Sequence, residues 1–122
     1  MPTLVADSTD PPCLFWVARI DACGVISIKS ALVVTGWSTG TPLSYTSDPD
    51  VIRVEPNRTG GHVVLNRGRI GIPSALRRRC SIHAGDSLLV TVNEEKRRLL
   101  IYHGALIQEL LKRYHLALFA PS

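Results

Sequence analysis

The sequence contains an internal repeat, and this repeat limits the folds open to the chain more than any other feature. When the chain is shifted by 44 residues, six of nine consecutive positions are identical. The matching residues are Gly24, Ile26, Ile28, Ser30, Ala31 and Leu32 in the first copy and Gly68, Ile70, Ile72, Ser74, Ala75 and Leu76 in the second. Because six identities in nine positions are hard to obtain by chance, we predict two copies of one structural unit.

Each copy is predicted to fold as strand, strand, short helix, strand, strand. Isoleucines at every second position indicate a half-buried strand. A short helix follows, and in the second copy it is predicted to begin at Pro73, since proline is well tolerated at the first helical position. A glycine then leads into two further strands, at 43–46 and 51–55 in the first copy and at 88–92 and 98–102 in the second.

The two copies are predicted to share one core. A unit of about forty residues has too little interior to fold alone. We therefore expect one barrel-like domain with a pseudo-two-fold axis, in which Ile26, Ile28, Ile70 and Ile72 are buried. The expected boundaries are a flexible arm at 1–13, a single domain at 14–103 with repeat one at 14–56, a linker at 57–61 and repeat two at 62–103, and a C-terminal amphipathic helix and tail at 104–122.

The second copy carries a run of arginines with no acidic residue among them. Arg67, Arg69, Arg77, Arg78 and Arg79 lie within thirteen residues. Guanidinium groups bind phosphate oxygens in a bidentate manner and can read guanine edges, so we expect these five residues to bind double-stranded DNA. The alternative is a solvated basic helix end, whose cations only complement the helix dipole.

Residues 62–102 resemble the AbrB, MazE and SpoVT family of swapped-hairpin DNA-binding domains. The resemblance rests on three short motifs, Gly68-Arg69-Ile70-Gly71-Ile72-Pro73, Leu76-Arg77-Arg78 and Ala84-Gly85-Asp86. Residues 17–55 show the pattern less well, and two copies in one chain resemble the MraZ branch of the group. The resemblance implies a mainly β fold with short helices, namely a swapped-hairpin β-barrel of two βαββ repeats. It also implies that Arg69, Arg77 and Arg78 grip DNA, and we expect these three side chains to be exposed.

The first copy departs from this pattern where the family binds DNA. The positions equivalent to the three gripping arginines hold Val25, Val33 and Val34. We therefore expect DNA to be gripped through the second copy alone. The first copy is then either the structural half of the domain or a surface that binds another protein through its valines and Trp37.

The resemblance and the arginine cluster together predict a transcriptional regulator. One alternative is the antitoxin of a toxin–antitoxin pair, with a toxin protein as partner. The other is a protein-interaction module that has lost DNA binding. We also expect a homodimer or larger assembly, because specific operators are typically read by symmetric dimers.

The sequence indicates no enzyme and no cofactor. It has no nucleophile elbow, no nucleotide-binding glycine loop and no carboxylate pair with a base. Its histidines and cysteines lack the spacing of metal ligands. Cys80 lies among arginines, which would lower the pKa of its thiol, although a packing role at the helix end is the simpler interpretation.

The expected location is the cytoplasm, in association with the nucleoid and not with a membrane. The three cysteines form no C-x-x-C pair, which does not suggest a disulfide framework. The N-terminus does not look like a signal peptide, and no apolar run approaches the length that spans a bilayer.

Overall fold

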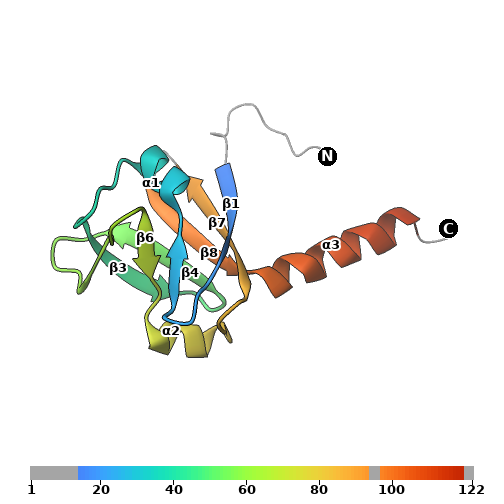
Figure 1. Ribbon diagram of the computed structural model, residues 1–122. Coiled ribbons are helices and arrows are strands. Elements are labelled where there is room, and N and C mark those ends of the chain that lie inside the picture. Colours follow the sequence, from blue (N-terminus) through green and yellow to red (C-terminus); the bar gives the residue numbers. More distant parts are fainter. Residues whose placement is uncertain (1–13, 94–96, 120–122) are drawn as a thin grey trace.

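The computed structural model describes residues 14–93 and 97–119, which form eight strands and three helices (Figure 1). In chain order these are β1 (Leu14–Arg19), β2 (Val25–Ser27), α1 (Lys29–Thr35), β3 (Pro42–Ser47), β4 (Val51–Pro56), β5 (His62–Val63), β6 (Arg69–Gly71), α2 (Ser74–Arg79), β7 (Ser87–Asn93), β8 (Arg98–His103) and α3 (Gly104–Phe119). The predicted mainly β class with short helices is confirmed, since strands hold 39 and helices 29 of the 103 described residues. The arm expected at 1–13 lies outside the described residues.

The strands form two antiparallel sheets. Six strands pair in the order β1–β7–β8–β4–β3–β5, and β2 pairs with β6 in a separate two-stranded sheet, here called the β2–β6 ribbon. Only the hairpins β3–β4 and β7–β8 join neighbours in the sequence. The pairs β1–β7, β4–β8, β3–β5 and β2–β6 all join the first half of the chain to the second. Each half therefore completes the sheets of the other.

Backbone hydrogen bonds between the halves occur in matching pairs. The N–H of Ile28 donates to the carbonyl of Gly68 at 2.8 Å, and the N–H of Ile72 donates to the carbonyl of Gly24 at 2.8 Å. Each donor and each acceptor of the second bond lies 44 residues from its equivalent in the first. In the β2–β6 ribbon, Ile26 also lies opposite its own equivalent. The contacts across the ribbon are thus reciprocal.

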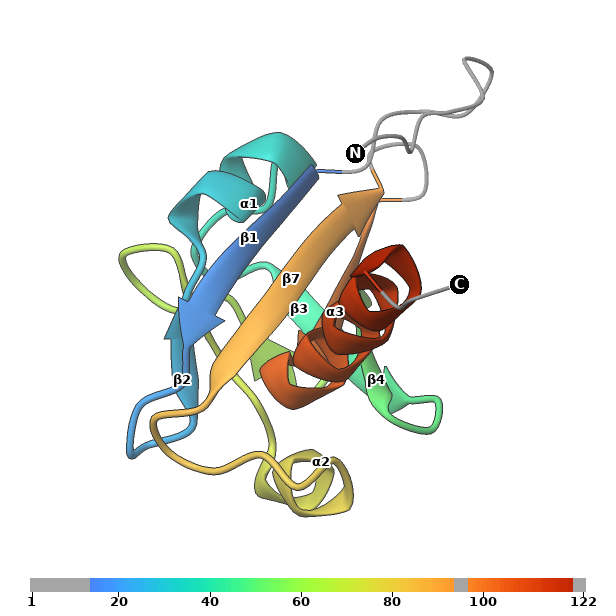
Figure 2. The same ribbon diagram turned by 90° about the vertical axis from the view of Figure 1, so that its right-hand side faces the viewer.

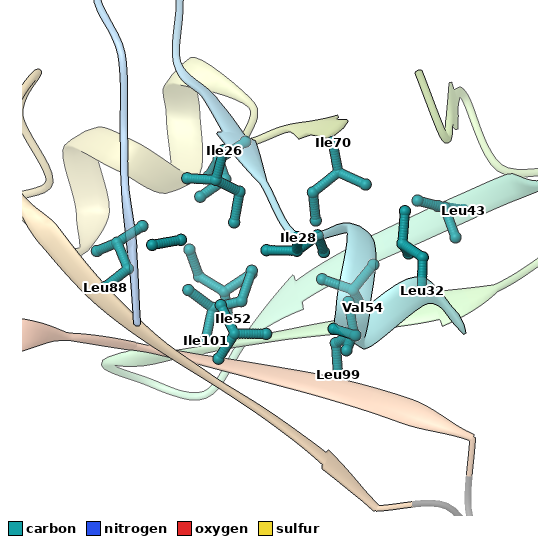
Figure 3. Close-up of a cluster of buried hydrophobic side chains, with 14 of the residues drawn as sticks. Ile26, Ile28, Leu32, Leu43, Ile52, Val54, Ile70, Leu88, Leu99 and Ile101 are labelled. Carbon is teal, nitrogen blue, oxygen red and sulfur yellow. The ribbon is translucent and has the colours of Figure 1, made fainter. Parts of the chain in front are cut away.

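One hydrophobic cluster fills the space between the ribbon and the large sheet (Figure 3). The four isoleucines predicted to be buried are all buried, which confirms the period-2 argument. Figure 3 shows Ile26 and Ile70 of the ribbon on the same cluster as Ile52 and Ile101 of β4 and β8. Strands of both halves contribute, so neither half has a core of its own.

Helix α2 begins at Ser74, so the predicted start at Pro73 is wrong. Pro73 is the residue before the helix, and its ψ of 142° continues the extended path of β6. Its carbonyl accepts hydrogen bonds from the N–H groups of Leu76 and Arg77, both at 3.0 Å. Pro73 therefore caps the helix through its carbonyl instead of forming the first helical residue.

Trp37 lies in the core and cannot serve the exposed binding role that the sequence left open for it. Gly36 ends α1 in the left-handed conformation with a φ of 79°, which turns the chain back toward the interior. Only 8% of Trp37 is exposed. Of the two helix valines, Val33 is exposed and Val34 packs against the core.

Helix α3 begins at Gly104, where the C-terminal helix was predicted to begin, and projects away from the sheets (Figure 1). Figure 2 shows β1 and β7 side by side next to this helix. Leu106 and Leu111 on α3 are exposed. No helix among the described residues is long and apolar enough to cross a membrane.

The core position of Ile70 is testable by truncation. Ile70→Ala should lower the free energy of unfolding by about 2–5 kcal/mol, because it leaves a cavity between the ribbon and the large sheet. Val33→Ala is the control, since Val33 is 73% exposed, and it should change the same free energy by less than about 0.5 kcal/mol. Urea denaturation followed by circular dichroism measures both, and equal losses would contradict the placement of Ile70.

Candidate nucleic-acid interface

Each end of the β2–β6 ribbon combines a helix from one half with a glycine turn from the other. At the first end, here called the α1 end, α1 lies beside the turn 65–69. At the second, the α2 end, α2 lies beside the turn 21–25. Both turns need glycine, because Gly24 and Gly68 have φ values of 81° and 69°, in the left-handed region. Figures 1 and 2 both show α1 and α2 on opposite sides of the ribbon.

Close packing shows which helix meets which turn. A Cβ atom added to Gly68 would lie 2.6 Å from the Cα atom of Lys29, the first residue of α1. A Cβ atom added to Gly24 would lie 2.6 Å from Cζ of Arg77 in α2. Each turn therefore touches the helix of the opposite half through a glycine without a side chain.

The α1 end gathers Arg67, Arg69 and Lys29. Arg67 and Lys29 are exposed, and Arg67 has a left-handed φ of 64°. Arg69 is half-buried, and its Nε donates to the carbonyl of Asn66 at 3.0 Å. Lys29 was not among the residues singled out from the sequence. No local pattern could have found it, because its neighbours lie about forty residues along the chain.

The α2 end gathers Arg77, Arg78 and Arg79. Arg77 is half-buried over the turn of the first half, and its Nε donates to the carbonyl of Ile72 at 2.9 Å. Arg79 donates to Oγ of Ser47 at 3.0 Å. Arg78 is exposed and free of such contacts within the described residues. The expectation of full exposure thus holds for Arg78 and is wrong for Arg69 and Arg77, because backbone carbonyls hold their guanidinium groups.

The five arginines do not form one cluster, although they lie within thirteen residues of sequence. Arg67 and Arg69 precede or open β6, whereas the other three follow it on α2. The hydrogen bonds that close the two ends lie four residues apart along the ribbon, which corresponds to about 14 Å at 3.4 Å per residue. The structure therefore separates two arginines from the other three.

Within the described residues, no arginine of this group takes part in an ion pair. Other cations there do pair, for example Arg98 with Glu55 at 2.7 Å and Arg53 with Asp48 at 3.5 Å. Asp21, in the turn at the α2 end, uses Oδ1 to accept the backbone N–H groups of Cys23 and Val25. The guanidinium groups at both ends thus remain available to an external anion.

Dipole complementarity accounts for part of this arrangement only. Three arginines occupy the last turn of α2, where cations interact favourably with the helix dipole. Arg67 and Arg69 lie in a turn and a strand, so no helix dipole explains them. A solvated helix end is therefore an incomplete account of the basic residues.

The Gly-Asp turn serves the structure. Oδ2 of Asp86 accepts the backbone N–H of His83 at 2.8 Å and lies 2.9 Å from Nε2 of His103. The hydrogen bond from His83 is the main reason that the pKa of Asp86 is lowered, and His103 adds to it. Because Nδ1 of His103 accepts the N–H of Ala105 at 2.9 Å, this turn is tied to the start of α3.

Cys80 is buried in the core cluster at the end of α2, which agrees with a packing role. Burial is the main factor that raises the pKa of the Cys80 thiol, and Asp50 raises it further, while Arg79 acts in the opposite direction. The expectation of a lowered pKa is therefore wrong, because burial disfavours the charged thiolate. In the part of the chain that the structure describes, no group of three or more potential metal ligands converges.

Comparison of the chain with protein-family models, with curated proteins and with solved structures finds no match.

The contact between Gly24 and Arg77 can be isolated with a matched pair of glycines. Gly36 has nearly the same φ as Gly24, 79° against 81°, but no atom lies within 4 Å of its added Cβ. Gly36→Ala should cost about 1–2 kcal/mol in unfolding free energy through backbone strain alone. Gly24→Ala should cost about 1 kcal/mol more, because it displaces Arg77 and its hydrogen bond to Ile72.

Urea denaturation of both variants gives the comparison. The excess cost of Gly24→Ala should disappear in an Arg77→Ala background, because the displaced side chain is then absent. An excess that persists in that background would show that Arg77 does not depend on Gly24.

Proposed function

We propose that this protein is a DNA-binding transcriptional regulator of the AbrB type, which grips double-stranded DNA through Arg67, Arg69, Arg77, Arg78 and Arg79. The observation that carries the proposal is the set of guanidinium groups at the ends of the β2–β6 ribbon without acidic partners among the described residues. Phosphate groups are the anions that arginine recognises best in a repeating array.

The proposal includes a swapped-hairpin barrel of two repeats. Its support is the strand order β1–β7–β8–β4–β3–β5 of the large sheet. If each strand is replaced by its equivalent in the other half (β1 by β5, β3 by β7 and β4 by β8, and the reverse), the same order is obtained when it is read from the opposite edge. Hydrogen bonds at the strand ends follow the same rule, with Gly40 donating to Val64 at 2.8 Å and Gly85 donating to Ile20 at 2.7 Å. Reciprocal contacts of this kind are what a pseudo-two-fold axis produces.

The held arginines are well prepared for binding. Arg69 and Arg77 use Nε to donate to backbone carbonyls, which fixes the guanidinium plane and leaves the terminal nitrogens for a phosphate. Immobilising a flexible side chain on binding costs about 0.5–1.5 kcal/mol, and much of this cost is already met in the folded protein. Arg67 and Arg78, which are exposed, supply further charge.

The DNA proposal is tested by the salt dependence of binding. Arg78→Ala should weaken binding to a duplex of the protein's own promoter region and lower the slope of log K against log salt by about 0.9, the value for one phosphate contact. Arg113→Ala is the control, because this exposed arginine lies on α3, away from both ends of the ribbon, and it should bind like the parent. Fluorescence anisotropy at several salt concentrations measures both variants.

The free energy of unfolding of Arg78→Ala, measured by thermal denaturation, should stay within about 0.5 kcal/mol of that of the parent, since the side chain is exposed. If the parent protein binds no duplex in a salt-dependent way, the DNA proposal falls. The protein-interaction module then becomes the better account, with the exposed Val33 of α1 as its first candidate contact.

We propose that the chain also forms a homo-oligomer, through the outer face of the large sheet. Phe15 and Val17 lie on β1, which is an edge strand of the large sheet, and these two apolar side chains are 65% and 70% exposed. The register places Val17 beside Leu89 and Leu89 beside Tyr102, so an apolar row crosses three strands. Exposed apolar patches of this kind mark interaction surfaces. A second copy of the chain would present the same row, which suits a two-fold interface.

Val17→Glu tests the assembly. The parent should be a dimer or larger at micromolar concentration, and Val17→Glu should be a monomer, because it places a charge in the apolar row. Ser30→Glu adds the same charge at an exposed position on α1, outside the large sheet, and should assemble like the parent. Sedimentation velocity measures all three, and a monomeric parent would rule out this interface.

A further inference from the structure

The first repeat contributes a cation to the ribbon although its own helix carries valines where the second carries arginines. Lys29 opens α1 and lies directly against the turn that bears Arg67 and Arg69, through its contact with Gly68. The hydrogen bond from Ile28 to Gly68, at 2.8 Å, holds the two segments together. Three cations from two distant parts of the sequence therefore meet at the α1 end.

We infer that the α1 end is a second phosphate-contacting site completed by Lys29, so that one chain contacts both DNA backbones that border a single groove. This inference rests on the proposed function, and it makes the first repeat a DNA-contacting half.

The charge at the α1 end favours this role. The segments 25–41 and 56–71, which build this end, contain no aspartate or glutamate. The α2 end has three arginines but also Asp21 in its turn. Counted over these side chains, the α1 end carries three positive charges and the α2 end a net two. The α1 end, whose helix carries valines, is thus at least as positively charged as the α2 end.

The spacing of the ends fits a groove. The two ends are separated by about 14 Å along the ribbon, and the major groove of B-DNA is about 12 Å wide. Between the ends, the outward positions of the ribbon include Ser27, Gly71 and the half-buried Val25. These small side chains let the duplex approach the backbone of the ribbon, and a two-stranded ribbon is an element that the major groove admits.

The hollow beside α1 agrees with an open, acid-free surface. It has a volume of about 380 Å³ and is lined by Lys29, Val33, Ser38, Thr39 and Gly68 together with neighbouring apolar residues, none of them acidic. Hydroxyl groups of Ser38 and Thr39 can donate to phosphate oxygens beside the ammonium group. The site thus offers a positive charge and neutral donors together.

Phosphate ethylation interference on a duplex of the protein's own promoter region tests the inference, with Lys29→Ala, Arg78→Ala and the control Lys112→Ala. Lys112 is exposed on α3, away from the ribbon. The parent should show two groups of essential phosphates per bound chain, one on each strand. Lys29→Ala should lose one group, Arg78→Ala should lose the other, and Lys112→Ala should lose neither.

Affinity measurements should agree with the interference pattern. Lys29→Ala and the longer neutral variant Lys29→Gln should both lower the salt slope of binding by about 0.9, whereas Lys29→Arg should keep it. Circular dichroism should show the parent fold for all three variants, since Lys29 is exposed. The use of two neutral variants and one charged variant separates the loss of charge from a change in packing.

Three outcomes would overturn the inference. If Lys29→Ala behaves like Lys112→Ala while Arg78→Ala weakens binding, the α1 end does not contact DNA and the proposed function stands. If a single variant removes both groups of phosphates, the two ends do not act on separate backbones. If the parent protein binds no duplex at all, the inference and the proposed function fall together.

Discussion

Backbone hydrogen bonds exchanged between the two halves are the interaction on which the rest of the structure depends. Buried N–H and carbonyl groups must find partners, and an unpaired one costs free energy comparable to a lost hydrogen bond. The N–H of Ile28 finds its partner in Gly68, and that of Ile72 finds it in Gly24. Since the donors and acceptors lie in opposite halves, neither half can satisfy its own ribbon strand. The shared core follows, because Ile26 and Ile70 are buried only when the two strands pair.

This exchange also decides where the charges lie. An antiparallel pairing of two short strands places the turn of one half next to the helix of the other, so each end of the ribbon is a composite. Arg67 and Arg69 are carried to α1 and Lys29, while the arginines of α2 meet the acidic turn of the first half. The charge around the apolar helix α1 and the charge around the basic helix α2 are therefore more alike than the sequences of the two helices indicate.

The surfaces proposed for DNA and for assembly do not compete. The cationic ends belong to the ribbon, whereas Phe15 and Val17 lie on the outer face of the large sheet. Alternate side chains of a strand point to opposite faces, so β1 packs Trp16 and Ala18 against the core and directs Phe15 and Val17 outward. One face of the sheet thus stabilises the fold, while on the other face Phe15 and Val17, beside the segment that α3 contacts, are exposed to a second copy of the chain.

The sequence by itself determined the features that depend on neighbours along the chain. The alternation of isoleucines predicted that the four of them are buried, and the predicted strand limits agree within one or two residues. These signals are local, since a period of two is set by a few consecutive residues. The abundance of arginine in the second half was equally plain.

Only the tertiary structure decided which distant groups meet. It placed Lys29 beside Gly68, laid Arg77 over Gly24 and turned Trp37 into the core. It also raised the pKa of Cys80 by burial, against the effect expected from its arginine neighbours. Each outcome depends on contacts between residues far apart in the chain, or on solvent exclusion by the whole fold. Sequence spacing carries no information on either, because the pairing of the two halves sets both.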